Sequence, residues 1–244
     1  MEIQRLERAE VEHARGVVIV IDVVRAFSVA AYALAGGAQA LWLVRTVEDA
    51  QALRQREPAA LLAGEVGGRL ISGFDFNNSP SQMAQANVKG RLLIQRTGAG
   101  TQGAVGAVNA THLLLCSLVN ARATAGYARQ LAATTDGQIT LLPTEPAWAN
   151  GTQPMEDQFC ADYLEALLRQ RSDAPEVLAE RITRLHTSGR FDEFKKGSSD
   201  FPFEDIAAVL AADRFHFAMV GIREQWNHLA YIHVQRKEMP ESAG

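Results

Sequence analysis

The stretch VVIVIDVVRAFSVAAYALAGGA, residues 17–38, decides the fold. Residues 17–24 are β-branched and apolar apart from Asp22, a pattern that predicts a strand buried on both faces of an α/β sheet. The following AFSVAAYALA predicts a helix, which Gly36 and Gly37 end. A buried strand that leads directly into an apolar helix is the opening unit of an alternating α/β fold.

Strand and helix patterns continue to alternate over most of the chain. Strands are predicted at 41–44, 60–65, 91–95, 112–118 and 138–144, and helices at 48–57, 120–132, 156–170 and directly after the glycine-rich turn 96–103. This alternation predicts a three-layer α/β/α fold with a mostly parallel or mixed sheet. We expect one α/β domain over residues 1–244, with two lobes that meet near residues 140–155 as the alternative.

The last part of the sequence is less regular. Helical patterns appear near 175–186 and 204–212, on either side of the polar segment KKGSSDFP at 195–202. The segment HLAYIHVQR at 228–236 alternates apolar and polar residues, which predicts an edge strand with one solvated face.

Composition narrows the class of protein. A net charge of −4 over 244 residues argues against a broad basic surface for nucleic acid. The longest apolar stretch, 17–24, is far shorter than the roughly 20 residues of a membrane-spanning helix, so no membrane association is expected. With no signal-peptide pattern, the expected location is the cytoplasm. Cys116 and Cys160 lack CxxC spacing, which predicts two reduced, buried thiols rather than a zinc site.

Polar residues are concentrated where the predicted strands end. Ligands of open α/β sheets bind at the carboxyl ends of strands, where loops face a common crevice. Asp22 and Arg25 follow the first strand, and Glu65 ends the third. An ionised carboxylate in an apolar run needs a partner, so Asp22 either pairs with Arg25 or caps a helix, or else it has a metal or catalytic role.

Three further segments can likewise have either a structural role or a role in binding and catalysis. The loop GEVGGRLISGFDFNNSP, 64–80, offers hard oxygen donors for Mg²⁺ but is also a turn-rich surface loop. RTGAGTQG, 96–103, suits either a phosphate cradle or a simple strand-to-helix turn, and no Gly-Lys-Ser/Thr follows it to make a nucleotide-binding P-loop. Glu156 and Asp157 either complement a helix dipole or bind a metal.

These motifs together resemble the 2-phosphosulfolactate phosphatase family. In the order in which the family has them, the chain contains IDVVRAFS (21–28), GEVGGRLISGFDFNNSP (64–80), TGAGT (97–101), SLVNARATA (117–125) and MEDQFCADYL (155–164). The resemblance implies a Mg²⁺-dependent phosphatase that converts 2-phospho-3-sulfolactate to 3-sulfolactate and phosphate, a reaction of coenzyme M biosynthesis. The chain departs from the family pattern at Gly98 and Ala99, where the family has Thr and Asn, and at Met155, where it has Gly.

The resemblance also implies roles for individual residues. The implied catalytic residues are Asp22, Arg25 and Glu65. The implied Mg²⁺ ligands are Asp22, Glu65, Asp75, Glu156 and Asp157. The implied substrate-binding residues are Asn78, Ser79, Thr97, Gly100 and Thr101. The expected partner is a small anionic phosphoester, and a homodimer is compatible with the sequence. The alternative function is an altered or non-catalytic relative that binds a phosphorylated or sulfonated metabolite, because the TGAGT loop has changed.

Overall fold

The computed structural model describes residues 1–144 and 155–239. Its strands are β1 (Glu2–Arg5), β2 (Val17–Ile21), β3 (Ala40–Leu43), β4 (Leu61–Val66), β5 (Arg69–Leu70), β6 (Leu92–Arg96), β7 (His112–Cys116), β8 (Gln138–Pro143), β9 (Phe217–Trp226) and β10 (Leu229–Glu238). Its α-helices are α1 (Ala26–Ala35), α2 (Val47–Arg56), α3 (Pro80–Gln85), α4 (Gly100–Gly106), α5 (Ala121–Ala132), α6 (Glu156–Leu168), α7 (Ala174–Thr187), α8 (Asp192–Lys196) and α9 (Glu204–Leu210). Short 3₁₀ helices lie at Arg8–His13 and Leu118–Asn120.

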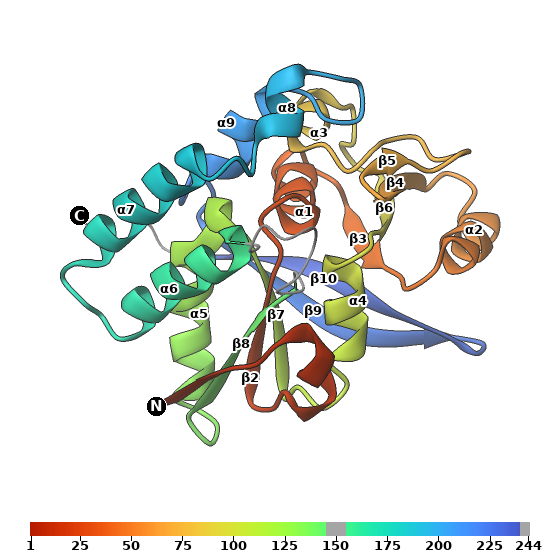
Figure 1. The fold of residues 1–244 in the computed structure, drawn as a ribbon. Coiled ribbons are helices and arrows are strands. Elements are labelled where there is room, and N and C mark those ends of the chain that lie inside the picture. Colours follow the sequence, from red (N-terminus) through yellow and green to blue (C-terminus); the bar gives the residue numbers. More distant parts are fainter. Residues whose placement is uncertain (145–154, 240–244) are drawn as a thin grey trace.

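The strands form one mixed sheet with helices on both sides, so the predicted three-layer α/β/α architecture is confirmed (Figure 1). The strand order is β1-β8-β2-β7-β9-β10-β3-β6-β4-β5. Strands β1, β8, β2 and β7 form one parallel block, and β3, β6 and β4 form a second. The antiparallel hairpin β9–β10 joins the two blocks. The alternative of two lobes that meet near residues 140–155 falls largely outside the described residues.

The prediction of an edge strand at 228–236 is wrong. Strand β10 lies inside the sheet, paired with β9 on one side and with β3 on the other. The alternation of apolar and polar residues reports only that one face of a strand is less buried. Whether a strand lies at an edge depends on its hydrogen-bonding neighbours, and the sequence pattern does not contain that information.

The sheet must curve strongly between its two blocks. The pairs β7–β9, β9–β10 and β10–β3 are all antiparallel. Since each pair reverses the strand direction, the two parallel blocks run in opposite directions. In a flat sheet their carboxyl ends would lie at opposite edges. In Figure 1 the blue hairpin crosses the view while β2, β7 and β8 run steeply, which is the accumulated twist of a large sheet.

Helix α1 occupies the inside of this curve. All of its residues from Ala26 to Leu34 are buried, because the sequence AFSVAAYALA is apolar or small on every side. Its side chains share a core with Val18 and Val20 from one block and with Leu41 and Leu43 from the other. A helix that is hydrophobic all round is stable only when it is enclosed, and the two blocks together with helices α3 and α4 enclose this one.

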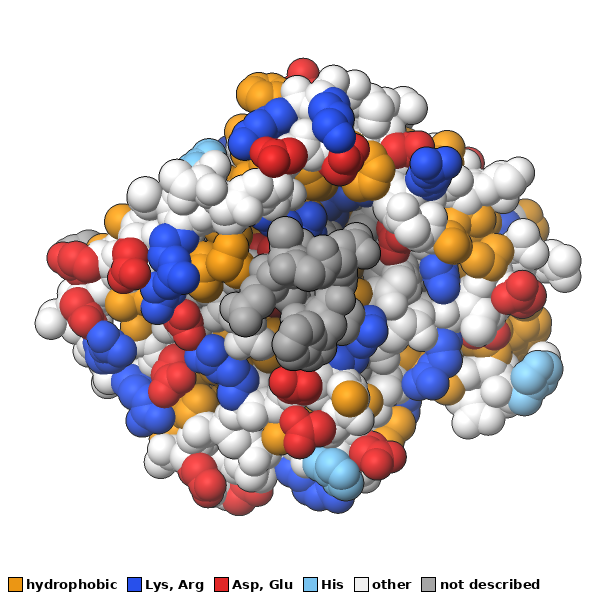
Figure 2. All heavy atoms as spheres, viewed as in Figure 1, with side chains coloured by type: hydrophobic (Ala, Val, Ile, Leu, Met, Phe, Trp, Pro, Cys, Tyr) orange, Lys and Arg blue, Asp and Glu red, His pale blue; other side chains and the backbone are white. Residues whose placement is uncertain are grey.

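Helices α2, α5 and α6 cover the outer faces. Helices α5 and α6 pack on the first block through Ile19, Ile21 and Leu141, and α2 packs on the second through Leu62 and Ile94. Within the described residues no helix is long and apolar enough to cross a membrane. On the face shown in Figure 2, the acidic and basic side chains of the described residues are interspersed rather than gathered into one basic surface.

The enclosure of α1 makes a prediction about stability. Phe27 on α1 is fully buried, so Phe27→Ala should lower the free energy of unfolding by about 3–5 kcal/mol through lost burial and a new cavity. Phe203→Ala is the matched control, because that ring is 59% exposed and its removal should change the value by less than about 0.5 kcal/mol. Urea denaturation measures both. Equal effects of the two changes would contradict the enclosed position of α1.

Candidate active site

A cavity of about 350 Å³ lies where strand ends from both blocks meet. Asp22 comes from the end of β2, Glu65 from β4, and Thr97 from the end of β6. The other lining residues are Val24, Arg25, Gly67, Gly68, Asn78, Gly98, Ala99, Arg190, Phe194 and Phe201. The curved sheet therefore brings acidic, basic and amide side chains from four separate segments of sequence around one space.

Asp22 is a buried acid at the amino end of α1. Its Oδ1 accepts a hydrogen bond from the Ala26 N–H at 2.8 Å, and its Oδ2 accepts one from Thr144 Oγ1 at 3.4 Å. Burial raises the pKa of Asp22 to about 6. The Ala26 N–H opposes this rise, and the neighbouring carboxylates Glu65 and Glu156 add to it. Asp22 thus binds the first N–H of α1, although Arg25 is the residue at the N-cap position of that helix. The pairing of Asp22 with Arg25, one of the alternatives considered, is not present, because Arg25 pairs with Asp205.

Glu65 ties two glycine-rich loops together. Its Oε1 accepts from the Gly98 N–H at 2.6 Å, and its Oε2 accepts from the Gly68 N–H at 2.7 Å. Charge-assisted bonds of this kind fix a carboxylate in one orientation. The two loops thus keep Glu65 beside the cavity and are themselves held in place by it.

Arg25 is buried and is held on several sides. Its guanidinium donates to Asp205 Oδ2 at 3.0 Å, to the Asp200 carbonyl at 2.6 Å and to the Gly68 carbonyl at 3.1 Å. The rings of Phe194 and Phe201 lie 5.4 and 5.0 Å from its central carbon. Burial lowers the pKa of Arg25, and the Asp205 carboxylate opposes that change.

The sequence analysis did not identify the segment from Arg190 to Asp205 as part of the site. It supplies three residues that line the cavity, Arg190, Phe194 and Phe201, and it carries the acid that pairs with Arg25. Its polar stretch has no recognisable motif and resembles a solvated linker. The only sequence signal for Asp205 was its position in the first turn of the helix predicted at 204–212. Acids are common at that position because they interact favourably with the helix dipole, so the signal did not indicate a functional role.

Asn78 reaches the cavity with a defined orientation. The Gln95 side-chain amide donates to the Ala26 carbonyl at 2.9 Å and to Asn78 Oδ1 at 3.4 Å. Because the Ala26 carbonyl can only accept, it fixes which end of the Gln95 amide faces it. Asn78 in turn presents its oxygen to Gln95, which leaves its NH₂ group as a donor for the cavity. Gln95 had no signal in the sequence beyond being a polar residue in a buried strand.

Several predicted substrate-binding residues lie behind the cavity wall. Thr101 is fully buried and exchanges hydrogen bonds with Thr97, from Thr97 N to Thr101 Oγ1 at 2.9 Å and from Thr101 N to Thr97 Oγ1 at 3.2 Å. Ser79 Oγ donates to Asp205 at 2.7 Å and accepts the Gln82 N–H at the start of α3. Gly100 packs its backbone against Asp22. Of the predicted set, Asn78 and Thr97 line the cavity itself.

The predicted metal ligands also separate into two groups. Asp75 is not among the lining residues, and it pairs with Arg54 at 2.7 Å and accepts the Leu62 N–H. Asp157 accepts from the N–H groups of Val23 and Thr144, which joins the ends of β2 and β8. Neither acid is among the residues that line the cavity, and the role of both as metal ligands stays a prediction.

Glu156 stands between these groups. It is fully buried beside Asp22 and accepts from Arg190 Nε at 2.6 Å. It therefore contributes negative charge behind the cavity wall, while Arg190 brings a guanidinium to the cavity itself.

The lining acids fit a magnesium ion. Among residues 1–144 and 155–239, no three acidic, histidine or cysteine side chains gather closely enough to form a metal cage by themselves. Mg²⁺ is commonly held by one or two carboxylates together with water and substrate phosphate, and Asp22 and Glu65 supply that number. The raised pKa of Asp22, caused by burial and by neighbouring carboxylates, is the condition that a bound cation would relieve.

The contact between Gly100 and Asp22 makes a second prediction. A Cβ atom at Gly100 would lie 2.6 Å from Asp22 Oδ2 and 2.8 Å from the Ala26 Cβ, so Gly100→Ala should destabilise the fold by about 1–3 kcal/mol. At Gly126 in α5 a Cβ meets its nearest neighbour at 3.5 Å, so Gly126→Ala should instead stabilise the protein by about 0.5–1 kcal/mol. Denaturant unfolding measures both signs. A stabilising Gly100→Ala would refute the close approach.

Known proteins are similar to this chain in sequence. A family model described as 2-phosphosulpholactate phosphatase matches residues 3–195. The probable 2-phosphosulfolactate phosphatase of Bacillus subtilis is 39% identical over 176 residues, which is 72% of this chain and 73% of that protein. The proteins of the same description from Deinococcus radiodurans and Thermus thermophilus are 41% and 44% identical, and the matches cover 64% and 61% of their lengths.

The matched residues contain most of the cavity. Asp22, Arg25, Glu65, Asn78 and Arg190 all lie within residues 3–195 and all line the same space. The family model covers well over half of the sequence, and its range includes the five motifs quoted above. This chain therefore belongs to the 2-phosphosulpholactate phosphatase family.

Proposed function

We propose that the protein is a Mg²⁺-dependent phosphatase that hydrolyses a small acidic phosphoester. The observation that carries this proposal is the meeting of Asp22, Glu65 and Arg25 around one cavity of about 350 Å³. Two carboxylates in such a space repel a phosphate unless a cation lies between them. A magnesium ion beside a guanidinium would turn an acidic cavity into one that accepts a polyanion.

The residues of this chain divide the work of phosphoryl transfer. Hydrolysis of a phosphomonoester depends on charge neutralisation and on placing the nucleophile in line with the leaving oxygen. Arg25 binds phosphate oxygens, and the Asn78 amide donates a hydrogen bond whose direction Gln95 fixes. Asp22 and Glu65 would hold Mg²⁺, which neutralises phosphate charge and activates water.

The proposed substrate is 2-phospho-3-sulfolactate, hydrolysed to 3-sulfolactate and phosphate. Support comes from the relatives, whose names give this activity as probable, and from the charges at the cavity. Arg25 and Arg190 both line it, and two guanidinium groups suit a ligand with anionic groups beside its phosphate. Gly98 and Ala99 line the same wall with no side-chain polar group, so the contacts there are made by backbone alone.

An altered relative that only binds such a metabolite is the weaker alternative. Its support is the changed TGAGT loop, which replaces polar side chains of the family pattern at Gly98 and Ala99. A binding protein would have no use for buried carboxylates beside a polyanion, whereas a metal-dependent hydrolase requires them. The retained acids therefore favour catalysis.

Metal dependence tests the proposed function directly. The purified protein should release phosphate from 2-phospho-3-sulfolactate or another 2-phosphocarboxylate with Mg²⁺ present, and excess EDTA should abolish the release, because the acids then repel the ester. Added Mg²⁺ should restore the rate, which excludes denaturation by the chelator. Full activity in EDTA would rule out the magnesium mechanism.

Substitution of single acids tests the assignment within the cavity. Asp22→Asn keeps the shape of the side chain and removes its charge, so kcat should fall by about 10²-fold or more. Asp75→Asn is the matched control, because Asp75 pairs with Arg54 outside the cavity and the change should leave kcat unaltered. Thermal melting of both variants shows that each is folded. If Asp22→Asn turned over normally, Asp22 would be a purely structural cap.

A further inference from the structure

We propose that Asp205 is a positioning residue that holds Arg25 in place for phosphate binding. The proposal rests on the proposed function for its catalytic meaning. It also makes Asp205 part of the site although it lies beyond residues 3–195, the range that the family model matches. The segment after residue 195 would then complete a site whose other parts come from the matched motifs.

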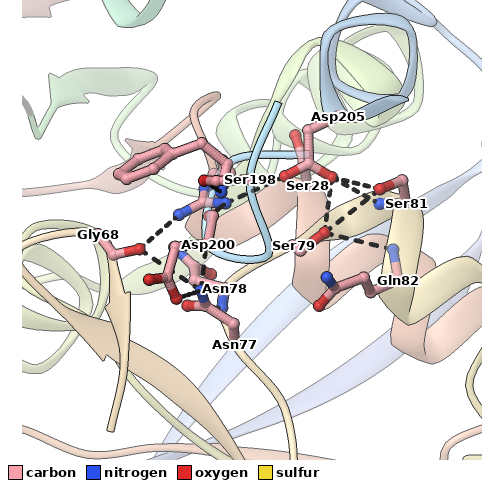
Figure 3. A network of polar contacts seen from close by, with 12 residues as sticks. Ser28, Gly68, Asn77, Asn78, Ser79, Ser81, Gln82, Ser198, Asp200 and Asp205 are labelled. Carbon is pink, nitrogen blue, oxygen red and sulfur yellow. Dashed lines mark hydrogen bonds and ion pairs between the residues drawn. The ribbon is translucent and has the colours of Figure 1, made fainter. Parts of the chain in front are cut away.

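The hydrogen bonds of Asp205 leave it one orientation. The residue is fully buried, and its Oδ1 accepts from Ser79 Oγ at 2.7 Å, from Ser81 N at 3.0 Å and from Ser81 Oγ at 2.6 Å (Figure 3). Its Oδ2 is thereby turned to Arg25, whose Nη1 lies 3.0 Å away. Because the serines of the NNSPS segment fix the carboxylate, the carboxylate in turn fixes the guanidinium.

Arg25 needs such a partner because other acids compete for it. Glu65 lines the same cavity and attracts the guanidinium electrostatically. An Arg25 paired with Glu65 would neutralise a proposed metal ligand and withdraw a cation from the phosphate. Asp205 instead forms a buried ion pair with Arg25 at 3.0 Å. The Asp200 carbonyl accepts a hydrogen bond from the same guanidinium nitrogen, which supports this pair over one with Glu65.

The neighbouring residues of the segment support the same geometry. Asp200 Oδ1 accepts from Asn77 Nδ2 at 2.8 Å and from the Leu70 N–H at 3.1 Å, which fastens this part of the chain to the loop 64–80. Phe194 and Phe201 face the guanidinium with their rings. Arg25 is therefore enclosed before any ligand arrives, and binding a phosphate requires little further ordering of its side chain.

The test is a double-mutant cycle between Asp205 and Arg25. Asp205→Asn should lower kcat/KM by about tenfold or more, mainly through a higher KM, since a hydrogen-bonded charge partner is lost. In an Arg25→Gln background, which keeps a hydrogen-bonding side chain, the same change should have an effect of less than about twofold. A merely structural Asp205 would lower kcat/KM equally in both backgrounds, and that result would overturn the proposal.

A matched control and a second readout complete the design. Asp213→Asn breaks another aspartate–arginine pair, in which Asp213 lies 3.1 Å from Arg122. Neither residue lines the cavity, so the change should lower the melting temperature without changing kcat/KM. Calorimetric titration with inorganic phosphate and Mg²⁺ should show the same Arg25-dependent loss of affinity in Asp205→Asn. If the parent hydrolysed no phosphoester but this coupling in phosphate affinity were found, the proposed function would fail and the positioning role would stand.

Should Asp205→Asn fail to fold, Ser81→Ala decides the question. It removes one donor to Asp205 Oδ1 and leaves the acid itself in place. A severalfold rise in KM and in the phosphate dissociation constant, present only when Arg25 is present, supports positioning. Parent-like values for both quantities would overturn it.

Discussion

The burial of helix α1 on every side is the constraint on which the rest of the structure depends. A helix with the sequence AFSVAAYALA has no face for water, so other elements must cover it on every side. Helices α3 and α4 cover part of it, and the two parallel blocks both reach it only because the sheet curves through the β9–β10 hairpin. The same curve brings the ends of β2, β4 and β6 together. The cavity is thus a geometric result of enclosing one apolar helix, with Asp22 and Arg25 at the point where the chain enters that helix.

The acids in and around the cavity differ in how many hydrogen-bond donors the fold provides for them. Asp157 and Asp205 accept from several backbone or side-chain donors and join distant segments. Asp22 has fewer donors, and its pKa is raised chiefly by burial and further by the neighbouring acids. The proposed function places its chemistry at this acid, for which the fold provides little compensation.

Local sequence patterns predicted many of the helices and strands, but they could not predict which strands pair with each other. Strand β2 and helix α1 were visible because burial on all sides leaves an unbroken apolar run. Strand β9 was missed, and β10 was wrongly placed at an edge, because hydrogen-bonding neighbours leave no trace in periodicity. The motifs identified Asp22, Arg25, Glu65 and Asn78 at the cavity. They could not separate these from Asp75 or Asp157, since a ligand-facing acid and a structural acid look alike until their partners are known.

The place of the β9–β10 hairpin in the sequence has a consequence for how the sheet is assembled. Both strands follow all the others in chain order, yet they lie at the centre of the sheet between β7 and β3. Until residues 217–238 have been synthesised, β7 and β3 are two unprotected edges, and unpaired edges of this kind invite aggregation. The nascent chain therefore keeps two open strand edges until every other strand of the sheet has been made, and one hairpin then pairs with both.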